Sequence, residues 1–329
     1  GGIVGMVRTA VAAGHAKVIG FDMGGTSTDV SHYAGEFERA FETQVAGVRM
    51  RAPMMSIHTV AAGGGSLLQF DGARLRVGPE SAGANPGPAS YRRGGPLATT
   101  DANVLLGKIA PAYFPKVFGP NADQALDRDV VVAKFEQLAA RIRGATGRDA
   151  SAESVGAGFL QIAVQNMANA IKRISVARGY DVTQYTLQCF GGAAGQHACL
   201  IADAVGITRV YIHPLAGVLS ALGLGLAEVT TIASRTVETP LNADSKALVD
   251  ATLAELAAQA CLQLVSQGIE AAHIRCKRGV HVRYEGTDTA LIVDDGTVAD
   301  IQARFESAYR QRYAFLMDDK PLVIEALSV

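Results

Sequence analysis

The chain has 329 residues, of which 49% are hydrophobic and 19% charged, and its formal net charge at pH 7 is −1. This length exceeds that of a typical compact domain, so we expect two or more units with substantial apolar cores. The balance of 30 basic and 31 acidic residues argues against binding to nucleic acid or to an anionic membrane surface.

The apolar runs, the first residues and the cysteines together predict a cytoplasmic protein. No uninterrupted apolar run reaches the roughly 18 residues of a membrane-spanning helix, so we expect no membrane contact. The first residues, 1–6, lack a signal-peptide pattern and an ordinary start, which suggests a fragment. The four cysteines form no C-x-x-C pair and have no zinc-like spacing with a histidine, which predicts reduced thiols.

The first elements in chain order are a helix and three strands. A helix over 3–13 ends at Gly14, and strands follow at about 17–22, 27–33 and 36–44. Ala34-Gly35 is a hairpin signal, so the second and third strands are expected to pair.

The turn between the first two predicted strands has the composition of a phosphate-binding loop. It contains the glycines Gly24 and Gly25 and the hydroxyl residues Thr26, Ser27 and Thr28, flanked by the acids Asp22 and Asp29. Glycines allow close backbone approach, and exposed N–H groups and hydroxyls donate to phosphate oxygens. The two carboxylates suit a hydrated Mg²⁺, which takes one or two such ligands. The alternative is a plain β-hairpin with a Gly-Gly turn.

A glycine- and proline-rich region follows over 48–105. It includes the triple glycine at 63–65 and a stretch over 78–88 in which proline and glycine exclude a helix or a central strand. Long loops of this kind are usually functional or disordered, and we favour an ordered functional loop here. A short helix is expected over 102–107, with Asp101 as its N-cap.

Helices then alternate with strands up to about residue 235. The predicted elements are helices at about 123–143 and 152–178, the second ended by Gly179, then a strand at 185–190, a helix at 196–205, a strand at 209–212 and a helix at 215–229. Without the glycine-rich insertion, the order is β-β-β-α-β-α-β-α. This order is that of a ribonuclease H-like α/β domain, which by itself does not indicate a function.

The pattern changes after about residue 235. Residues 236–240 are interpreted as a linker, followed by a helix at 244–267, strands at 274–285 and 289–293, a helix at 298–312 and a strand at 321–329. The expected domains are therefore a ribonuclease H-like unit over 1–235, with an insertion at about 46–150, and an α+β module over 236–329. The module carries no recognisable catalytic pattern, which favours a structural or interface role.

Two segments resemble actin-like ATPases. Residues 22–31 are similar to the second phosphate loop of that class, and the strand–Gly191-Gly192–helix segment is similar to its adenosine loop. The resemblance implies a ribonuclease H-like half of an actin-like ATPase, in which both loops lie on one half of the molecule. No second D-x-G-G-T hairpin occurs, so half of the nucleotide cleft is expected outside this chain.

Longer motifs narrow the resemblance to the hydantoinase A and 5-oxoprolinase family. They lie at 18–31, 61–66, 77–91 and 100–107. The segments 189–199 and 212–224 are similar to the 5-oxoprolinase branch in particular, where hydantoinase-like branches have a proline and a leucine in place of Gly195-Gln196-His197. The similarity is strong over about 1–230 and weaker over the last hundred residues.

The resemblance implies an ATP-dependent cyclic amidohydrolase that uses ATP and Mg²⁺. In the 5-oxoprolinase branch, 5-oxo-L-proline, ATP and water become L-glutamate, ADP and phosphate. The implied partners are the missing N-terminal ATPase half and a hydantoinase B-type region or subunit, and a homo-oligomer is expected. Two alternatives stay open: a hydantoinase or ketone carboxylase subunit, and a non-catalytic actin-like nucleotide-binding module.

The resemblance also suggests roles for acidic residues and one histidine. Asp22 is expected to orient Mg²⁺ or its water, and Asp29 to support it or to cap the hairpin. His58 is a candidate acid/base or a core histidine. Asp101 resembles a family acid, although capping of a helix explains it equally well.

Nucleotide-binding roles fall to the glycine-rich segments. Gly24, Gly25, Thr26 and Ser27 are expected at the β- and γ-phosphates, Gly63, Gly64 and Gly65 at the substrate or the γ-phosphate, and Gly191, Gly192 and Ala193 at the nucleoside. Simple strand–helix packing is the alternative for the last three. Gln196 and His197 are expected to cap a helix or to touch ligand.

Four arginines are candidates for binding a substrate carboxylate, because a guanidinium matches that group's planar shape. They are Arg49, Arg51, Arg92 and Arg93. Taken singly, each fits an ordinary surface charge as well.

Overall fold

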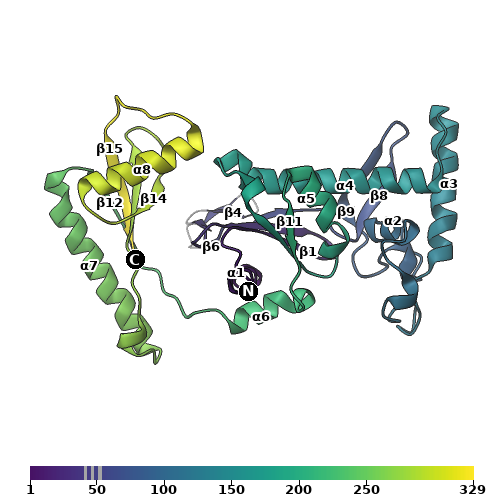
Figure 1. The fold of residues 1–329 in the computed structure, drawn as a ribbon, viewed down its shortest axis with the longest axis horizontal. Helices are drawn as coiled ribbons and strands as arrows, with labels where there is room; N and C mark the ends of the chain where they lie inside the picture. Colours follow the sequence, from purple (N-terminus) through teal and green to yellow (C-terminus); the bar gives the residue numbers. More distant parts are fainter. Residues whose placement is uncertain (41–42, 46–47, 51–53) are drawn as a thin grey trace. The chain divides into compact units, whose positions relative to one another are not determined.

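The computed structural model describes residues 1–40, 43–45, 48–50 and 54–329. The chain divides into two compact units. Unit 1 comprises residues 1–177 and 181–227, and unit 2 comprises residues 178–180 and 228–329. Both are mixtures of helices and strands, so the chain has a mixed α/β fold (Figure 1).

Unit 1 is built on a five-stranded sheet in the order β11-β10-β1-β2-β7. The strands are β1 (Val18–Met23), β2 (Thr28–Tyr33), β7 (His58–Val60), β10 (Thr186–Phe190) and β11 (Arg209–Tyr211). β2 runs antiparallel to both β1 and β7, whereas β10 runs parallel to both β1 and β11. The first strands therefore form a meander, and the later ones are reached by helical crossovers.

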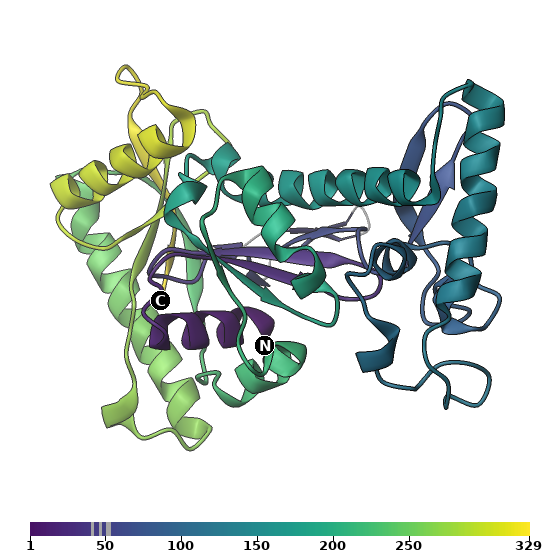
Figure 2. The same cartoon turned by 45° about the vertical axis from the view of Figure 1, so that its right-hand side comes forward.

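Helices cover both faces of this sheet (Figures 1 and 2). On one face, α1 (Gly2–Ala12) packs against α6 (Leu219–Gly225), and Met6, Val18 and Leu219 share an apolar cluster. On the other face lie α4 (Ala152–Ile174) and α5 (Ala198–Val205). Phe21 and Ile19, which are fully buried, alternate along β1 with residues that face α1, as expected for a sheet covered on both sides.

A large excursion separates β2 from α4. It holds the two-stranded ribbons β3 (Arg39–Ala40) with β6 (Met54–Met55), β4 (Thr43–Val45) with β5 (Val48–Met50), and β8 (Ser66–Phe70) with β9 (Leu75–Ser81), followed by α2 (Thr99–Leu105) and α3 (Arg128–Thr146). Phe135 of α3 packs with Phe159 and Leu160 of α4 in a separate apolar cluster. α3 crosses the N-terminal part of α4, so this excursion has a core of its own (Figure 2).

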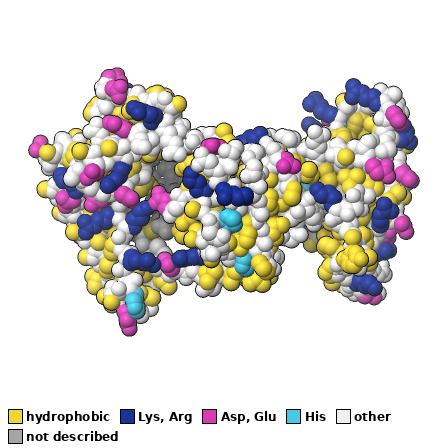
Figure 3. All heavy atoms as spheres, in the orientation of Figure 1, with side chains coloured by type: hydrophobic (Ala, Val, Ile, Leu, Met, Phe, Trp, Pro, Cys, Tyr) yellow, Lys and Arg dark blue, Asp and Glu magenta, His cyan; other side chains and the backbone are white. Residues whose placement is uncertain are grey.

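Unit 2 is a four-stranded antiparallel sheet with two helices. The strand order is β12-β15-β13-β14, made of β12 (Ser234–Pro240), β13 (Gly279–Tyr284), β14 (Leu291–Asp294) and β15 (Leu322–Ser328). α7 (Ala243–Ser266) and α8 (Val298–Tyr313) contribute Val249, Leu253 and Phe305 to its core. On the face drawn in Figure 3, acidic and basic side chains are interspersed in each unit.

Three sequence-based expectations about elements are wrong. The third strand of the main sheet is β7, not 36–44, because β3 pairs with β6 instead. Residues 236–240 are part of the edge strand β12 rather than a linker, which fits their alternation and the terminal position of Pro240. α4 ends at Ile174, where the Ser175 hydroxyl bonds the Ile171 carbonyl, well before Gly179.

Helix α7 bears on the expectation that no helix spans a membrane. It is the one helix, among the residues that the structure describes, that is long and apolar enough to do so by length and composition alone, a test that core helices also pass. In unit 2 its residues Val249, Leu253 and Leu256 pack into the core.

Candidate functional site

The turn between β1 and β2 presents open donors at its tip. The Gly24 N–H donates to the Ser27 carbonyl over 3.1 Å, which closes the turn, and Gly25 and Thr26 are exposed. In the described part of the chain, no hydrogen bond involves the N–H groups of Gly25 and Thr26 or the hydroxyls of Thr26 and Ser27. Unused donors on a glycine turn are suited to an anion such as phosphate.

Two carboxylates lie side by side at the base of this turn. Asp22 and Asp29 are directly opposite each other in the antiparallel register, so their side chains project from the same face of the sheet. Burial and, second, the charge of Asp29 raise the pKa of Asp22, while a hydrogen bond from Ser220 of α6 opposes this. Thr59 of β7 donates to Asp29 Oδ1 over 2.6 Å.

This pair of carboxylates could hold one divalent cation. Mg²⁺ characteristically keeps several waters and takes one or two carboxylates together with phosphate oxygens. Repulsion between Asp22 and Asp29 is relieved when a cation lies between them. Across residues 1–40, 43–45, 48–50 and 54–329, no group of three or more His, Cys, Asp or Glu side chains forms a fuller metal site.

The triple glycine packs directly against the turn. Gly64 N–H donates to the Gly24 carbonyl over 3.0 Å, and Gly65 N–H donates to the Gly25 carbonyl over 2.6 Å. A Cβ placed on Gly63 would lie 2.6 Å from the Gly25 carbonyl oxygen, so only glycine allows this approach. The loop therefore fixes the backbone of the turn from outside the sheet.

The double-glycine corner after β10 meets the same hairpin. Gly191 has a φ of +84°, and a Cβ there would collide with the Asp22 carboxylate and lie 2.6 Å from the Met23 carbonyl oxygen. Ala193 N–H donates to that same carbonyl over 3.0 Å. Gly192 is exposed and faces open space. Three segments that are distant in sequence thus converge on one turn.

Gln196 and His197 connect this corner to α2. The Asn103 side-chain amide donates to Gln196 Oε1 over 2.8 Å and lies 3.2 Å from His197 Nε2. Burial, with a contribution from the charge of Lys108, lowers the pKa of His197 to about 4. His197 is the N-cap residue of α5, as expected, although its side chain makes no capping hydrogen bond.

Asp101 has a structural environment rather than a reactive one. It is fully buried, and its carboxylate accepts from the backbone N–H groups of Ala89, Ser90 and Ala98, each over 2.9 Å. Burial raises its pKa. The N-cap of α2 is Ala98, and Asp101 lies three residues into the helix, which corrects the expectation that Asp101 is the cap itself.

His58 is placed away from the paired carboxylates. It is opposite Val30 in the β2–β7 register, whereas its neighbour Thr59 is opposite Asp29. Because side chains alternate across a sheet, His58 shares the face of Val30 and not that of Asp22. The structure does not bring it to the turn, and its acid/base role stays a prediction.

Of the candidate arginines, the two whose side chains the structure describes, Arg92 and Arg93, make contacts away from the turn. Arg92 binds the Ala125 carbonyl and forms an ion pair of 2.7 Å with Asp127, and Arg93 bonds the Gly119 carbonyl over 3.3 Å. Both arginines therefore bind groups within the same excursion, the segment between β2 and α4. Arg49 lies in β5 with its side chain outside the description, and Arg51 lies outside the described residues.

Sequence reasoning missed four polar residues that support the site: Thr59, Thr100, Asn103 and Ser220. Thr100 donates from both its N–H and its hydroxyl to the Gly64 carbonyl, over 2.8 and 2.9 Å. Thr59 was hidden because its strand was placed elsewhere. Asn103 and Ser220 lie inside recognised motifs, but only their three-dimensional neighbours reveal their contacts.

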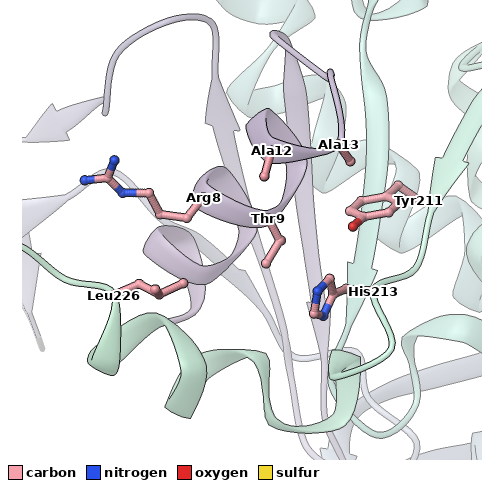
Figure 4. Close-up of a pocket in the computed structure, with 7 residues that line it drawn as sticks. All are labelled: Arg8, Thr9, Ala12, Ala13, Tyr211, His213 and Leu226. Carbon is pink, nitrogen blue, oxygen red and sulfur yellow. The ribbon is translucent and has the colours of Figure 1, made fainter.

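A cavity of about 440 Å³ lies on the α1 side of the sheet, apart from the predicted residues. Figure 4 shows Tyr211 and His213 facing Thr9 of α1, with Leu226 on the opposite side of Thr9, at the left of the view. None of the candidate residues named from the sequence lines it. The candidate residues at the converging turns therefore lie outside this cavity.

Comparison with known proteins assigns the chain to a family. The profile of the hydantoinase/oxoprolinase family matches residues 1–233. The 5-oxoprolinase of Dictyostelium discoideum is 39% identical over all of this chain, and 5-oxoprolinase 1 of Arabidopsis thaliana is 41% identical over 98% of it. The chain spans 27% and 26% of those two proteins, about a quarter of their length.

Solved structures agree with this assignment. The ATP-dependent caprolactamase of Pseudomonas jessenii has a TM-score of 0.80 and 27% identity, covering 99% of this chain and 48% of that one. Nucleotide-free acetone carboxylase has a TM-score of 0.67 with the same coverage, and at 22% identity it supports the fold alone. The chain belongs to the hydantoinase/oxoprolinase family.

Proposed function

We propose that unit 1 is the ribonuclease H-like half of an actin-like ATPase fold. The supporting observation is the sheet order, in which β7, β2 and β1 form an antiparallel meander and β10 and β11 continue in parallel. In such a fold the β1–β2 turn is the phosphate loop and the corner after β10 borders the nucleoside. The other half of the cleft belongs to the remainder of the full-length protein.

The full-length protein is, in this proposal, an ATP-dependent cyclic amidohydrolase of the 5-oxoprolinase type. It converts 5-oxo-L-proline, ATP and water to L-glutamate, ADP and phosphate. Identities of 39–41% to 5-oxoprolinases, against 29% to the caprolactamase α subunit, favour this substrate over a larger lactam. Because the chain spans only 27% and 26% of the two 5-oxoprolinases compared, a further ATPase half and a B-type region are the proposed partners.

The single observation that carries the proposal is the convergence at the β1–β2 turn. The open donors of Gly25, Thr26 and Ser27 bind the β- and γ-phosphates, and Asp22 with Asp29 hold hydrated Mg²⁺. Bound Mg²⁺ neutralises charge on the phosphates. The Ser220 and Thr59 hydroxyls orient the two carboxylates, and the triple glycine keeps the turn in its binding conformation.

The reaction explains why a lactamase needs a nucleotide. A five-membered lactam is a poor electrophile with a poor leaving group. Transfer of the γ-phosphoryl group to its carbonyl oxygen gives an imidate-like species that water attacks at carbon. Phosphoryl transfer depends chiefly on positioning and charge neutralisation, which a donor-lined turn and a carboxylate-held cation provide.

The arrangement of the corner supports a place for the nucleoside beside Gly192. Gly192 is exposed, and a Cβ added to it would meet nothing within 4 Å, so its backbone leaves open space for a base or a ribose. The hydrogen bond from Asn103 to Gln196 connects this corner to α2. The free thiols of all four cysteines are in keeping with a cytoplasmic protein.

The test uses the full-length enzyme and two matched acid-to-amide variants. Asp22→Asn is expected to lower 5-oxoproline-dependent ADP release by about 100-fold or more, because charge stabilisation at the phosphates is lost. Asp71→Asn, an exposed turn acid outside the site, is expected to keep normal turnover. Near-normal turnover of Asp22→Asn would refute the assignment.

Two further assays separate the alternatives. Hydantoin, caprolactam and acetone replace 5-oxoproline in the same ADP assay, and turnover of one of these in its place would reassign the substrate. ATP-driven conformational change without turnover of any of them would favour a non-catalytic nucleotide-binding module. We expect the 329-residue chain alone to release no phosphate from ATP.

A further inference from the structure

Two thiols meet in unit 2, in a region that the proposed function does not use. Cys261 lies in the C-terminal part of α7, and Cys276 lies in the segment 274–278 that leads into β13. Their Sγ atoms are 3.5 Å apart and form a hydrogen bond. Both cysteines are free.

The pair is accessible from solvent. Cys276 is exposed and Cys261 is half-buried, so a small reagent reaches Cys276 first. The segment 274–278 is neither helix nor strand, so its side chains can turn without breaking a ladder. A disulfide requires the sulfurs to approach to about 2.05 Å, which rotation about the side-chain bonds can supply over this short gap.

Basic residues surround the exposed thiol. Arg275, Lys277 and Arg278 flank it in sequence, and each forms an ion pair, with Glu228, Asp294 and Asp295 respectively. The hydrogen bond with Cys261 and partial burial raise the pKa of Cys276, while the charge of Arg278 opposes this. Since the thiolate is the reactive form, the reaction is expected to accelerate as the pH rises through 8.

We propose that Cys261 and Cys276 form a reversible dithiol–disulfide site that reacts with low-molecular-weight disulfides. The Cys276 thiolate attacks one sulfur of the reagent, forms a mixed disulfide and releases one thiol. Cys261 then attacks Cys276 Sγ, forms the intramolecular S–S bond and releases the second thiol. The two cysteines lose two electrons and two protons, and the reagent is reduced to two thiols.

The disulfide would join two parts of unit 2 covalently, whereas in the reduced protein they are held together by non-covalent contacts alone. It ties the C-terminal part of α7 to the start of β13, which is a central strand of the sheet. A covalent link across such a loop restricts the unfolded chain and so stabilises the folded unit. Cys189 and Cys199 provide the internal comparison, because Cys189 is buried and Cys199 lies exposed in unit 1.

The experiment treats the whole chain with oxidised glutathione at pH 8.5 and counts thiols in denaturant. The count is expected to fall by two from the four of the reduced chain, and to recover with dithiothreitol. Peptic digestion at acidic pH followed by mass spectrometry is expected to find the Cys261–Cys276 peptide pair. The midpoint of thermal unfolding is expected to rise by about 5 °C or more.

Two serine variants decide the assignment. Cys276→Ser is expected to abolish both the linked peptide and the thermal shift, whereas Cys199→Ser keeps both. Circular dichroism of each reduced variant verifies that it is folded. Glutathione adducts without the Cys261–Cys276 link, a link through Cys199 instead, or an unchanged thiol count would each overturn the proposal.

Discussion

Asp22 lies where two requirements conflict. Its position opposite Asp29 places two negative charges on one face of the sheet, and burial first, then the charge of Asp29, raise its pKa. A fold selected for stability alone would avoid such a pair, since like charges directly opposite each other in a sheet are destabilising. The pair therefore costs stability in the free chain, which is consistent with the proposed role in binding a cation.

Asp29→Asn is expected to stabilise the free chain at pH 7 by about 0.2–1 kcal/mol, because it removes one of two opposed charges. Asparagine can still accept from Thr59. Because the pKa of Asp22 is raised in the fold, the folded chain loses stability as the pH rises and this carboxyl ionises. The stabilisation by Asp29→Asn is therefore expected at pH 7 and not at pH 3. Urea unfolding at both pH values measures it, and an equal effect at the two would contradict it.

His197→Asn tests a buried neutral histidine. The pKa of His197 is about 4 in the fold and about 6.5 when unfolded, so its contribution to stability is complete above pH 6.5 and is lost as pH falls towards 4. Between pH 7 and 4.5, the free energy of unfolding of the variant is expected to fall by about 1–3 kcal/mol less than that of the unsubstituted chain.

Chemical denaturation of both proteins at pH 7 and 4.5 measures the effect of His197. His281 of unit 2, whose pKa burial also lowers to about 4, is present in both proteins and cancels in the comparison. Identical pH profiles would show that His197 is not the titrating group.

At the scale of elements, the site is a junction of loops held by backbone contacts. The β1–β2 turn supplies the donors, the triple-glycine loop supports it, and the corner after β10 closes its other side. Each contact depends on the absence of a side chain at one position. The glycines therefore differ in their surroundings: some permit close packing and others face open space.

Gly63→Ala and Gly25→Ala are expected to separate these two purposes. A Cβ on Gly63 meets backbone at 2.6 Å, so we expect a loss of stability of about 1–3 kcal/mol. A Cβ on Gly25 meets nothing within 4 Å, so its effect on stability is expected to stay within about 0.5 kcal/mol. Guanidinium unfolding measures both, and equal losses would show that the loop is not packed against the turn as described.

At the scale of the whole molecule, the chain has separate apolar cores. Phe135 lies in a core of unit 1 and Phe305 in that of unit 2, and both are fully buried. The contact pattern that separates the units predicts that each has its own unfolding transition.

Phe135→Ala and Phe305→Ala are expected to lower different transitions in differential scanning calorimetry. Each removes a fully buried ring, so the unit that carries it is expected to lose about 3–5 kcal/mol. The other transition serves as the control within the same sample. A single transition lowered by both variants would mean that the two units unfold together.

Much of the secondary structure could be predicted, because it depends on local patterns. The helical spacing over α4, and the apolar segments on either side of the glycine turn for β1 and β2, predicted those elements closely. β7 could not be found, because three residues carry too little periodicity, and its role comes from pairing with β2. The sheet position taken from 36–44 was wrong for the same reason.

The sequence alone determined the family, the mixed α/β class and the turn to which we assign phosphate binding, because contiguous residues hold that information. Only the tertiary structure decided which segments surround the turn and which acids remain exposed. Asp101 matches a family motif as well as Asp22 does, yet three backbone N–H groups enclose its carboxylate. The physical reason is that burial and hydrogen bonding come from contacts between residues far apart in the chain, which local composition does not encode.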